Sequence, residues 1–115
     1  KDFMGSHYLY IICSDGHAIF DVPTGKRINP NDSSIVIGDH VWAGVHVTIL
    51  PGTTVGSGSV IGAKATVKGR YPNNCIIAGS IARVIRKDIA WSRSIMAEDI
   101  GKCPSEYVHK TSDER

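Results

Sequence analysis

The chain has 115 residues, 42% of them hydrophobic, which suits a single domain with a buried core. Its formal net charge is +2, a mild balance that indicates neither nucleic acid nor another polyanion as a partner. No apolar run approaches the roughly 18 residues of a membrane span, and no signal-peptide pattern opens the chain. The three cysteines (Cys13, Cys75 and Cys103) have no metal-binding spacing and cannot all pair, which favours a reducing, cytoplasmic compartment.

Residues 1–13 are interpreted as part of a coil built from a six-residue repeat that becomes regular further along the chain. Four residues fall on the inward positions of that repeat when it is counted back from Ile12: Met4, Ser6, Tyr10 and Ile12. Because Lys1 stands in the middle of this pattern, we expect the sequence to be a piece of a longer protein whose earlier coils precede it.

Residues 14–34 break the repeat and are rich in Gly, Pro, Asn and Asp, so they are expected to form a protruding loop. A loop of about twenty residues is uncommon in a compact domain and is usually functional. This loop carries His17, flanked by Asp15 and Asp21. A loop held by a rigid scaffold is where reactive groups are most often placed, so His17 is a candidate for chemistry.

Residues 35–70 read in sixes as IVIGDH, VWAGVH, VTILPG, TTVGSG, SVIGAK and ATVKGR. The first place is small or β-branched, the third is apolar, and Gly follows the third place four times. A period of six differs from the 3.6 of a helix and from the alternation of a plain strand. It predicts a parallel β-helix in which places one and three fill the interior and Gly permits the turn. Hairpins would instead need tight turns at varied spacing.

Three sixes complete one coil, so residues 18 positions apart should lie above one another. Trp42 should therefore face outward above Val60 and, if the register survives residues 71–74, Ala78. At the neighbouring corner a column of small residues is expected, made of Gly44, Gly62 and Ala63 with Gly79 nearby. Such a column would leave backbone amides open to a long, thin ligand; the alternative is that these glycines only serve the turns.

After residues 71–74, the segment 75–86 (CIIAGSIARVIR) predicts a last apolar strand with a basic exit. Ile89, Met96 and Ile100 have loosely helical spacing, which predicts a short C-terminal helix. The chain is thus divided into a β-helix domain (1–86) and a C-terminal helix and tail (87–115). His40 and His46 occupy turn places and are expected to face solvent. The scattered histidines predict no metal site.

The segments VWAGVHVTILPGTTVGSGSVIGAKATV and IIAGSIARVIR resemble the hexapeptide-repeat acetyltransferases, which are left-handed β-helix enzymes that use acetyl-CoA. SDGHAIFD and TGKRINP resemble the branch that O-acetylates sugars and capsular polysaccharides. The left hand is implied only by the resemblance, because most parallel β crossovers are right-handed. Alternatives are a small-molecule acetyltransferase acting on an antibiotic, an amine or serine, and a non-catalytic β-helix scaffold. A γ-class carbonic anhydrase would need three zinc-binding histidines.

The resemblance implies roles for individual residues. His17 matches the family's catalytic histidine, which as a neutral imidazole takes a proton from a hydroxyl for direct acetyl transfer. Asp15, Asp21 or a backbone carbonyl could hold its other ring nitrogen. Trp42 matches the tryptophan of the family's VWIG motif and could wall the acetyl pocket or donate its indole N–H to the oxyanion.

The resemblance also implies a groove for coenzyme A and an assembly. The residues that match the groove are Trp42, Gly44, Gly62, Ala63, Lys68, Ala78, Gly79, Arg83 and Arg86. The two arginines match the family's contacts to the phosphates, a chemistry that guanidinium groups suit well. The family usually has Pro two places after the glycine that matches Gly79, whereas this chain has Ser80 followed by Ile81. A homotrimer is implied, in which His17 faces the groove of an adjacent subunit and apolar outward residues are covered.

Overall fold

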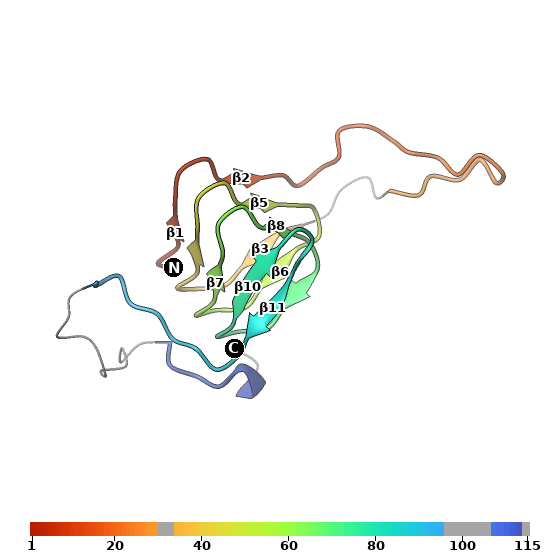
Figure 1. The fold of residues 1–115 in the computed structure, drawn as a ribbon. Helices are drawn as coiled ribbons and strands as arrows, with labels where there is room; N and C mark the ends of the chain where they lie inside the picture. Colours follow the sequence, from red (N-terminus) through yellow and green to blue (C-terminus); the bar gives the residue numbers. More distant parts are fainter. Residues whose placement is uncertain (30–33, 96–106, 114–115) are drawn as a thin grey trace.

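The computed structural model describes residues 1–29, 34–95 and 107–113. Short parallel strands stack into a three-sided prism (Figure 1). The first side holds β1 (Met4–Gly5), β4 (Trp42–Ala43), β7 (Val60–Ile61), β10 (Ile76–Gly79) and β11 (Ala82–Arg86). The second side holds β2 (Tyr10–Ile11), β5 (Thr48–Ile49) and β8 (Thr66–Val67). The third side holds β3 (Val36–Ile37), β6 (Thr54–Val55) and β9 (Arg70–Tyr71).

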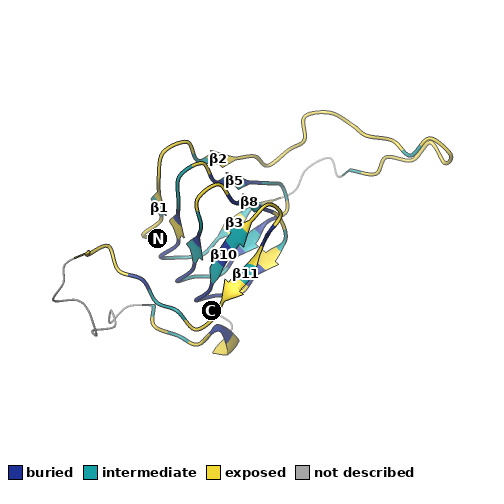
Figure 2. Cartoon of the chain, in the orientation of Figure 1, coloured by how far each residue is buried: buried dark blue, intermediate teal, exposed yellow. Residues whose placement is uncertain are grey.

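The interior of the prism is filled by places one and three of the six-residue repeat, as the sequence predicts (Figure 2). Buried apolar residues at these places are Val41, Ala43, Val47, Ile49, Val55, Ile61, Ala65 and Val67. Two inward residues are polar, and each finds a partner: Thr53 Oγ1 donates to Leu50 O at 2.7 Å, and Ser59 Oγ donates to Pro72 O at 3.1 Å. Because buried hydroxyls with partners cost little, the narrow core tolerates them.

The glycines at the fourth place allow neighbouring coils to approach, but they do not take the positive φ of the turn. A Cβ on Gly44 would lie 2.9 Å from Ala63 N, and one on Gly56 would lie 2.3 Å from Asn73 N. The left-handed conformation falls at the sixth place of the first five repeats. Its residues are His40, His46, Gly52, Gly58 and Lys64, with φ between 54° and 80°. The fourth-place glycines thus stand where a Cβ would be obstructed, as expected, while the positive φ of the turn falls two residues later.

The coil shortens before residues 71–74, not within them. Trp42 pairs with Val60 after 18 residues, whereas Val60 pairs with Ile76 after 16, so the expected partner Ala78 is displaced by two. The two residues are lost between β8 and β9, where the Tyr71 hydroxyl lies 3.2 Å from Lys68 N and 2.7 Å from Ala82 O. A tyrosine at an inward place thus closes the last coil with its own hydrogen bonds.

Residues 1–13 form an earlier coil, as expected, but with the opposite phase. Gly5 pairs with Ala43 and Ile11 pairs with Ile49, so these two residues take the inward places. The backbone sets this register, since Met4 N donates to Val41 O at 2.9 Å. A slip of one residue moves every side chain to the other face, which is why counting back from Ile12 gives the wrong set.

Of the expected loop 14–34, residues 14–29 protrude from the prism after β2, as predicted, and residues 30–33 lie outside the described residues (Figures 1 and 2). The expected C-terminal helix is wrong over residues 87–95, and the rest of it lies outside the described residues. Ile89 N donates to Asn74 O at 3.0 Å, so this backbone bonds to the prism instead of to itself. A 3-10 turn, η2 (Thr111–Asp113), ends the described tail. No helix in the described ranges is both long and apolar enough to cross a membrane.

Candidate active site

The outer surface of the first side carries the residues that the sequence singled out for the acetyl pocket. Trp42 lies on β4 with its indole 38% exposed, next to Val60 on β7 and then Ile76 on β10. Because Ala43 and Ile61 point inward on the same strands, Trp42 must point outward. A large aromatic side chain on an otherwise flat sheet can form one wall of a site.

A strip without long side chains runs beside Trp42 along the edge of the same sheet. It consists of Gly44, Gly62 and Ala78, and a Cβ on Gly62 would lie 3.2 Å from that of Ala78. The amides are not open, however: Gly44 N donates to Ile61 O at 2.8 Å and Gly62 N to Ile77 O at 2.7 Å. The expectation of free amides is therefore wrong, because these groups join successive coils. What the glycines provide is a surface with no side chains.

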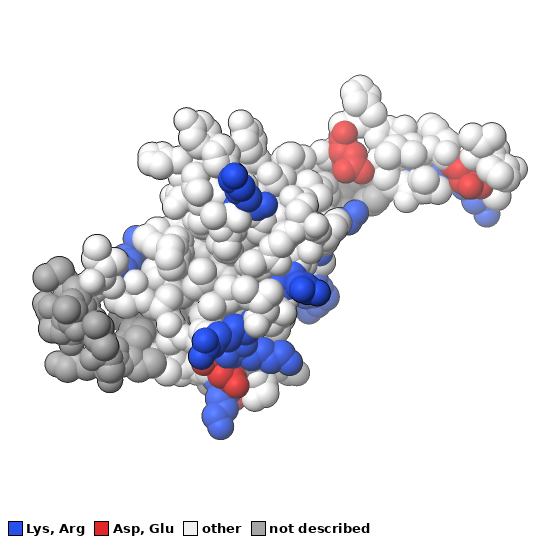
Figure 3. All heavy atoms as spheres, viewed as in Figure 1, with Lys and Arg blue, Asp and Glu red and all other residues white. Residues whose placement is uncertain are grey.

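Strand β11 brings basic groups to the end of this strip. It runs antiparallel to β10, so that Arg83 pairs with Ala78, Ala82 with Gly79 and Arg86 with Ile76. Both arginines are exposed, and Figure 3 shows basic side chains gathered around β11. Ala63 follows β7 at the corner and is exposed. Lys68 belongs to the second side.

His17 belongs to the protruding segment 14–29, which extends away from the first side of the prism (Figure 1). Its carbonyl accepts a hydrogen bond from Asn29 Nδ2 at 2.8 Å, and the same amide donates to Asp15 Oδ2 at 2.8 Å. Asp21 Oδ2 accepts instead from Thr24 Oγ1 at 2.6 Å. Within the described part of the chain, neither carboxylate is bonded to the imidazole ring of His17.

Asn29 is a residue that sequence reasoning missed. Besides holding Asp15 and the His17 carbonyl, its side-chain oxygen accepts from Ile19 N at 2.8 Å. The Asn29 side chain therefore links the returning part of the loop to residues on either side of His17, namely Asp15 and Ile19. An asparagine closing a long loop leaves no signal in a single sequence, because its partners are mostly backbone atoms.

A buried aromatic cluster joins the first side to the C-terminal tail, and it corrects the expectation for His40. Only 7% of His40 is exposed, and its ring stacks on Trp91 at 3.8 Å and on Tyr107 at 4.9 Å. Trp91 in turn contacts Trp42, with ring centroids 5.9 Å apart. His40 is buried because the tail covers this turn, which the repeat pattern cannot reveal. His46, by contrast, is exposed as expected.

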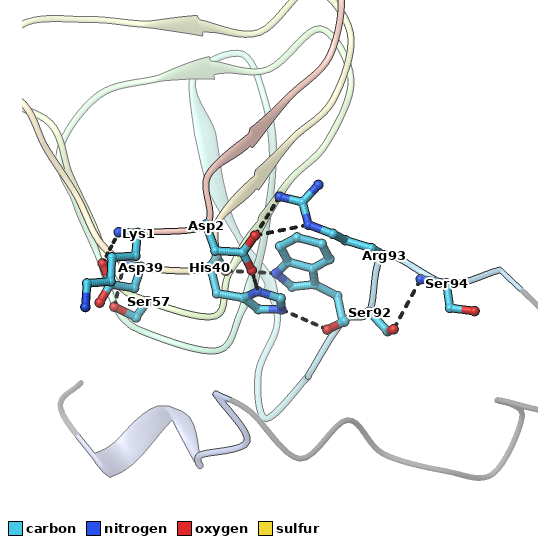
Figure 4. A network of polar contacts seen from close by, with 9 residues as sticks. Lys1, Asp2, Asp39, His40, Ser57, Ser92, Arg93 and Ser94 are labelled. Atoms are coloured by element: carbon cyan, nitrogen blue, oxygen red, sulfur yellow. Dashed lines mark hydrogen bonds and ion pairs between the residues drawn. The ribbon is translucent and has the colours of Figure 1, made fainter.

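Asp2 anchors the cluster from the first coil (Figure 4). Its Oδ2 is bonded to His40 Nδ1, and its Oδ1 accepts from Arg93 Nη2 at 2.6 Å and Nε at 3.0 Å. The hydrogen bond from His40, followed by that from Arg93, holds the pKa of the Asp2 carboxyl below its usual range. Asp2 is therefore ionised at neutral pH.

A cavity of about 530 Å³ lies on the third side and is lined by none of the predicted site residues. Its walls are Thr54, Gly56, Arg70, Tyr71, Pro72, Asn73 and Thr111. Among the described residues, no three His, Cys, Asp or Glu side chains gather as they would around a metal ion. The strip beside Trp42 remains the place where predicted residues converge.

Comparison with known proteins places these features in context. Residues 34–69 match the family model described as bacterial transferase hexapeptide (six repeats). A polysialic acid O-acetyltransferase of Escherichia coli O1:K1 / APEC is 40% identical over 113 residues, which cover 96% of this chain and 36% of that protein. The chain thus spans little more than a third of the length of this relative.

Two solved structures share the fold. The polySia-specific acetyltransferase NeuO is 42% identical, with a TM-score of 0.75 over 84% of this chain and 41% of that one. A galactoside acetyltransferase in complex with coenzyme A is 30% identical, with a TM-score of 0.51 over 85% of this chain and 48% of that one.

Proposed function

This chain belongs to the hexapeptide-repeat acetyltransferases, whose left-handed parallel β-helix it shares, and we propose that it transfers acetyl from acetyl-CoA to a sugar or surface-polysaccharide hydroxyl. The observation that carries the proposal is the strip from Trp42 past Gly44 and Gly62 to Arg83. A sheet edge without side chains fits the long, thin arm of coenzyme A. Arg83 and Arg86 at its end suit the phosphates.

The reaction is a direct transfer with His17 as the general base. The neutral imidazole takes the proton of the acceptor hydroxyl, and the oxygen attacks the thioester carbonyl to give a tetrahedral oxyanion. The indole N–H of Trp42 donates to that oxyanion. The C–S bond then breaks, and the thiolate of coenzyme A takes the proton from His17. Ala63 and the backbone at Gly79 complete the groove without entering the chemistry. The resemblance assigns Lys68 to the groove as well, but it follows β8 on the second side and is left out of the strip.

The positions of His17 and Trp42 support a site shared between subunits. The loop carries His17 away from the prism, and its apolar side chains are uncovered: Ile19, Phe20, Val22 and Ile28 are all more than half exposed. Apolar groups in such number favour burial against another surface. In a homotrimer, His17 of one subunit would face the first side of the next. Asp15 would orient His17 through the shared amide of Asn29 rather than by touching the ring.

A cytoplasmic location fits a donor made inside the cell, and it fits the free, exposed thiol of Cys13. The mechanism requires no metal ion. The acceptor is assigned only as a class, because the acceptor named for one relative belongs to that relative.

The proposal is tested by thiol release from acetyl-CoA in the full-length protein with a panel of glycans, comparing wild type with His17→Ala. Loss of a general base should lower turnover by about 100-fold or more while coenzyme A binding is retained. His46→Asn, which changes an exposed histidine on the prism, is the matched control and should keep full turnover.

Three results would contradict parts of this account. Full turnover in His17→Ala would remove His17 from the chemistry. Acetylation of an antibiotic, an amine or serine but of no glycan would reassign the acceptor. No binding of coenzyme A by either protein would leave a β-helix scaffold as the function.

A further inference from the structure

Trp91 comes from the C-terminal tail, outside the repeat, and yet it contacts the tryptophan of the proposed acetyl pocket. Its indole is 6% exposed and lies against Trp42 at 5.9 Å with an interplanar angle of 46°. Its Nε1 donates to the carbonyl of His40 at 2.9 Å, and its ring stacks on that of His40 at 10°. One hydrogen bond and one stack therefore fix the plane of Trp91, and through it one side of Trp42.

The ring of His40 lies between two acceptors. Its Nδ1 meets the carboxylate of Asp2, and its Nε2 lies 3.0 Å from the carbonyl oxygen of Trp91. Contacts at both ring nitrogens and stacking on Trp91 and Tyr107 therefore fix the position of the His40 ring.

Groups from several elements support the His40 ring. Asp2 precedes β1, and Arg93 of the tail binds its other oxygen while lying 5.9 Å from the Trp91 ring centroid. Asp39, the neighbour of His40 in the chain, accepts from the backbone nitrogen of Lys1 (Figure 4). Tyr107 covers the remaining face of the ring. Removal of the His40 ring would take away the stack and the Nε2 contact that hold Trp91.

We infer that Trp91 is a positioning residue for Trp42, and that the His40 ring holds Trp91 in place. This inference rests on the proposed function, since it concerns the orientation of the indole that faces the acetyl group. Without Trp91, the Trp42 side chain loses its described ring contact and is free to leave the orientation that donates to the oxyanion. The loss should therefore appear in kcat and not in KM for acetyl-CoA.

The test measures kcat, KM for acetyl-CoA and Tm in the full-length protein for four variants. Trp91→Phe keeps a ring against Trp42 but loses the N–H, and Trp91→Ala removes both. His40→Asn removes the stacked ring at a left-handed position that asparagine tolerates. His46→Asn is the matched control, because His46 occupies the same place of the repeat with φ of 57° but is exposed.

We expect kcat to fall by about 10-fold in Trp91→Phe and further in Trp91→Ala, with KM for acetyl-CoA unchanged. His40→Asn should also lower kcat with KM unchanged, while the control keeps the wild-type kcat. A merely structural role would lower Tm and leave the kcat of the folded protein at the wild-type value. Wild-type kcat in both Trp91→Phe and His40→Asn would overturn the inference. The function itself would fail only if His17→Ala kept full turnover or coenzyme A did not bind.

Discussion

Cys75 occupies an inward place immediately before β10, and its surroundings fix its chemistry. It is fully buried, its Sγ lies 3.1 Å from Pro72 O, and Ser59 Oγ lies 3.7 Å away. Burial raises the pKa of the Cys75 thiol, and this outweighs the lowering by Ser59. Because the thiolate is the reactive form, a thiol kept neutral in the core is inert at neutral pH.

Thiol labelling at pH 8 tests this assignment in a Cys103→Ser background. The exposed Cys13 should react quickly and Cys75 slowly, since the raised pKa and the burial both withhold the thiolate. Cys13→Ser should abolish the fast phase, and Cys75→Ala should leave it unchanged. A fast phase that disappears in Cys75→Ala would show that the core thiol is accessible.

Asp2 gives a second prediction at the residue scale, which concerns the stability of the protein at low pH. A carboxyl whose folded pKa is lowered contributes stability above its unfolded value, and that stability is lost as pH falls through the lowered pKa. Asp2→Asn should therefore lower Tm by a constant amount above about pH 5, where an aspartate of ordinary pKa is also ionised in the unfolded chain. The difference should shrink toward zero as the pH falls below about 4. A difference that does not change with pH would mean that the charge of Asp2 contributes nothing.

At this scale, the sequence indicated the outward residues of the repeat but not the partners that the tail brings to them. Trp42 could be placed because periodicity fixes the side of each strand, whereas Arg83 was expected only from the family resemblance. His40 could not be placed, because nothing in its repeat distinguishes it from His46. A tryptophan at position 91, outside the repeat, was the available signal that the tail docks on the prism.

At the scale of the elements, the corner of each coil has two structural requirements, which fall at different places of the repeat. The fourth place needs no side chain where coils touch, whereas the sixth place needs a left-handed backbone. Glycine satisfies both, so its frequency alone could not assign the turn. Lys64 shows that the sixth place tolerates a long side chain, with φ of 62°.

A pair of substitutions separates these two requirements. Gly56→Ala should destabilise the prism by about 1–3 kcal/mol, because its Cβ would meet the backbone of Asn73, which cannot move aside. Lys64→Gly should be neutral or slightly stabilising, since glycine adopts a positive φ freely. Denaturant unfolding of the two variants measures both. A large loss in Lys64→Gly with none in Gly56→Ala would reverse the assignment.

The repeat predicted the coils and the core, but it could not fix where the register changes. In residues 1–13 the alternation of apolar side chains fits either phase, and only the hydrogen bonds to Val41 and Ala43 decide. After β8, Tyr71 takes an inward place two residues early because its hydroxyl reaches Lys68 and Ala82. The apolar residues of the tail have helical spacing, but two hydrogen bonds between the Ile89 backbone and Asn74 hold this segment against the prism instead.

For the whole molecule, the prism is a rigid support that separates the two halves of the proposed site. The strip beside Trp42 is on the first side, whereas His17 stands on a loop that leaves between the second and third sides. The apolar face of that loop has no cover in the single chain. A homotrimer would bury this face and would bring the two halves together, which links the assembly to the chemistry.

The most direct measurement is therefore acetyl transfer by coexpressed His17→Ala and Trp42→Ala subunits of the full-length protein. Each variant alone should be nearly inactive. If each site takes His17 from one subunit and Trp42 from the next, random mixing should restore about a quarter of wild-type turnover, because that share of sites receives both native residues. Turnover no higher than that of the single variants would contradict a site shared between subunits.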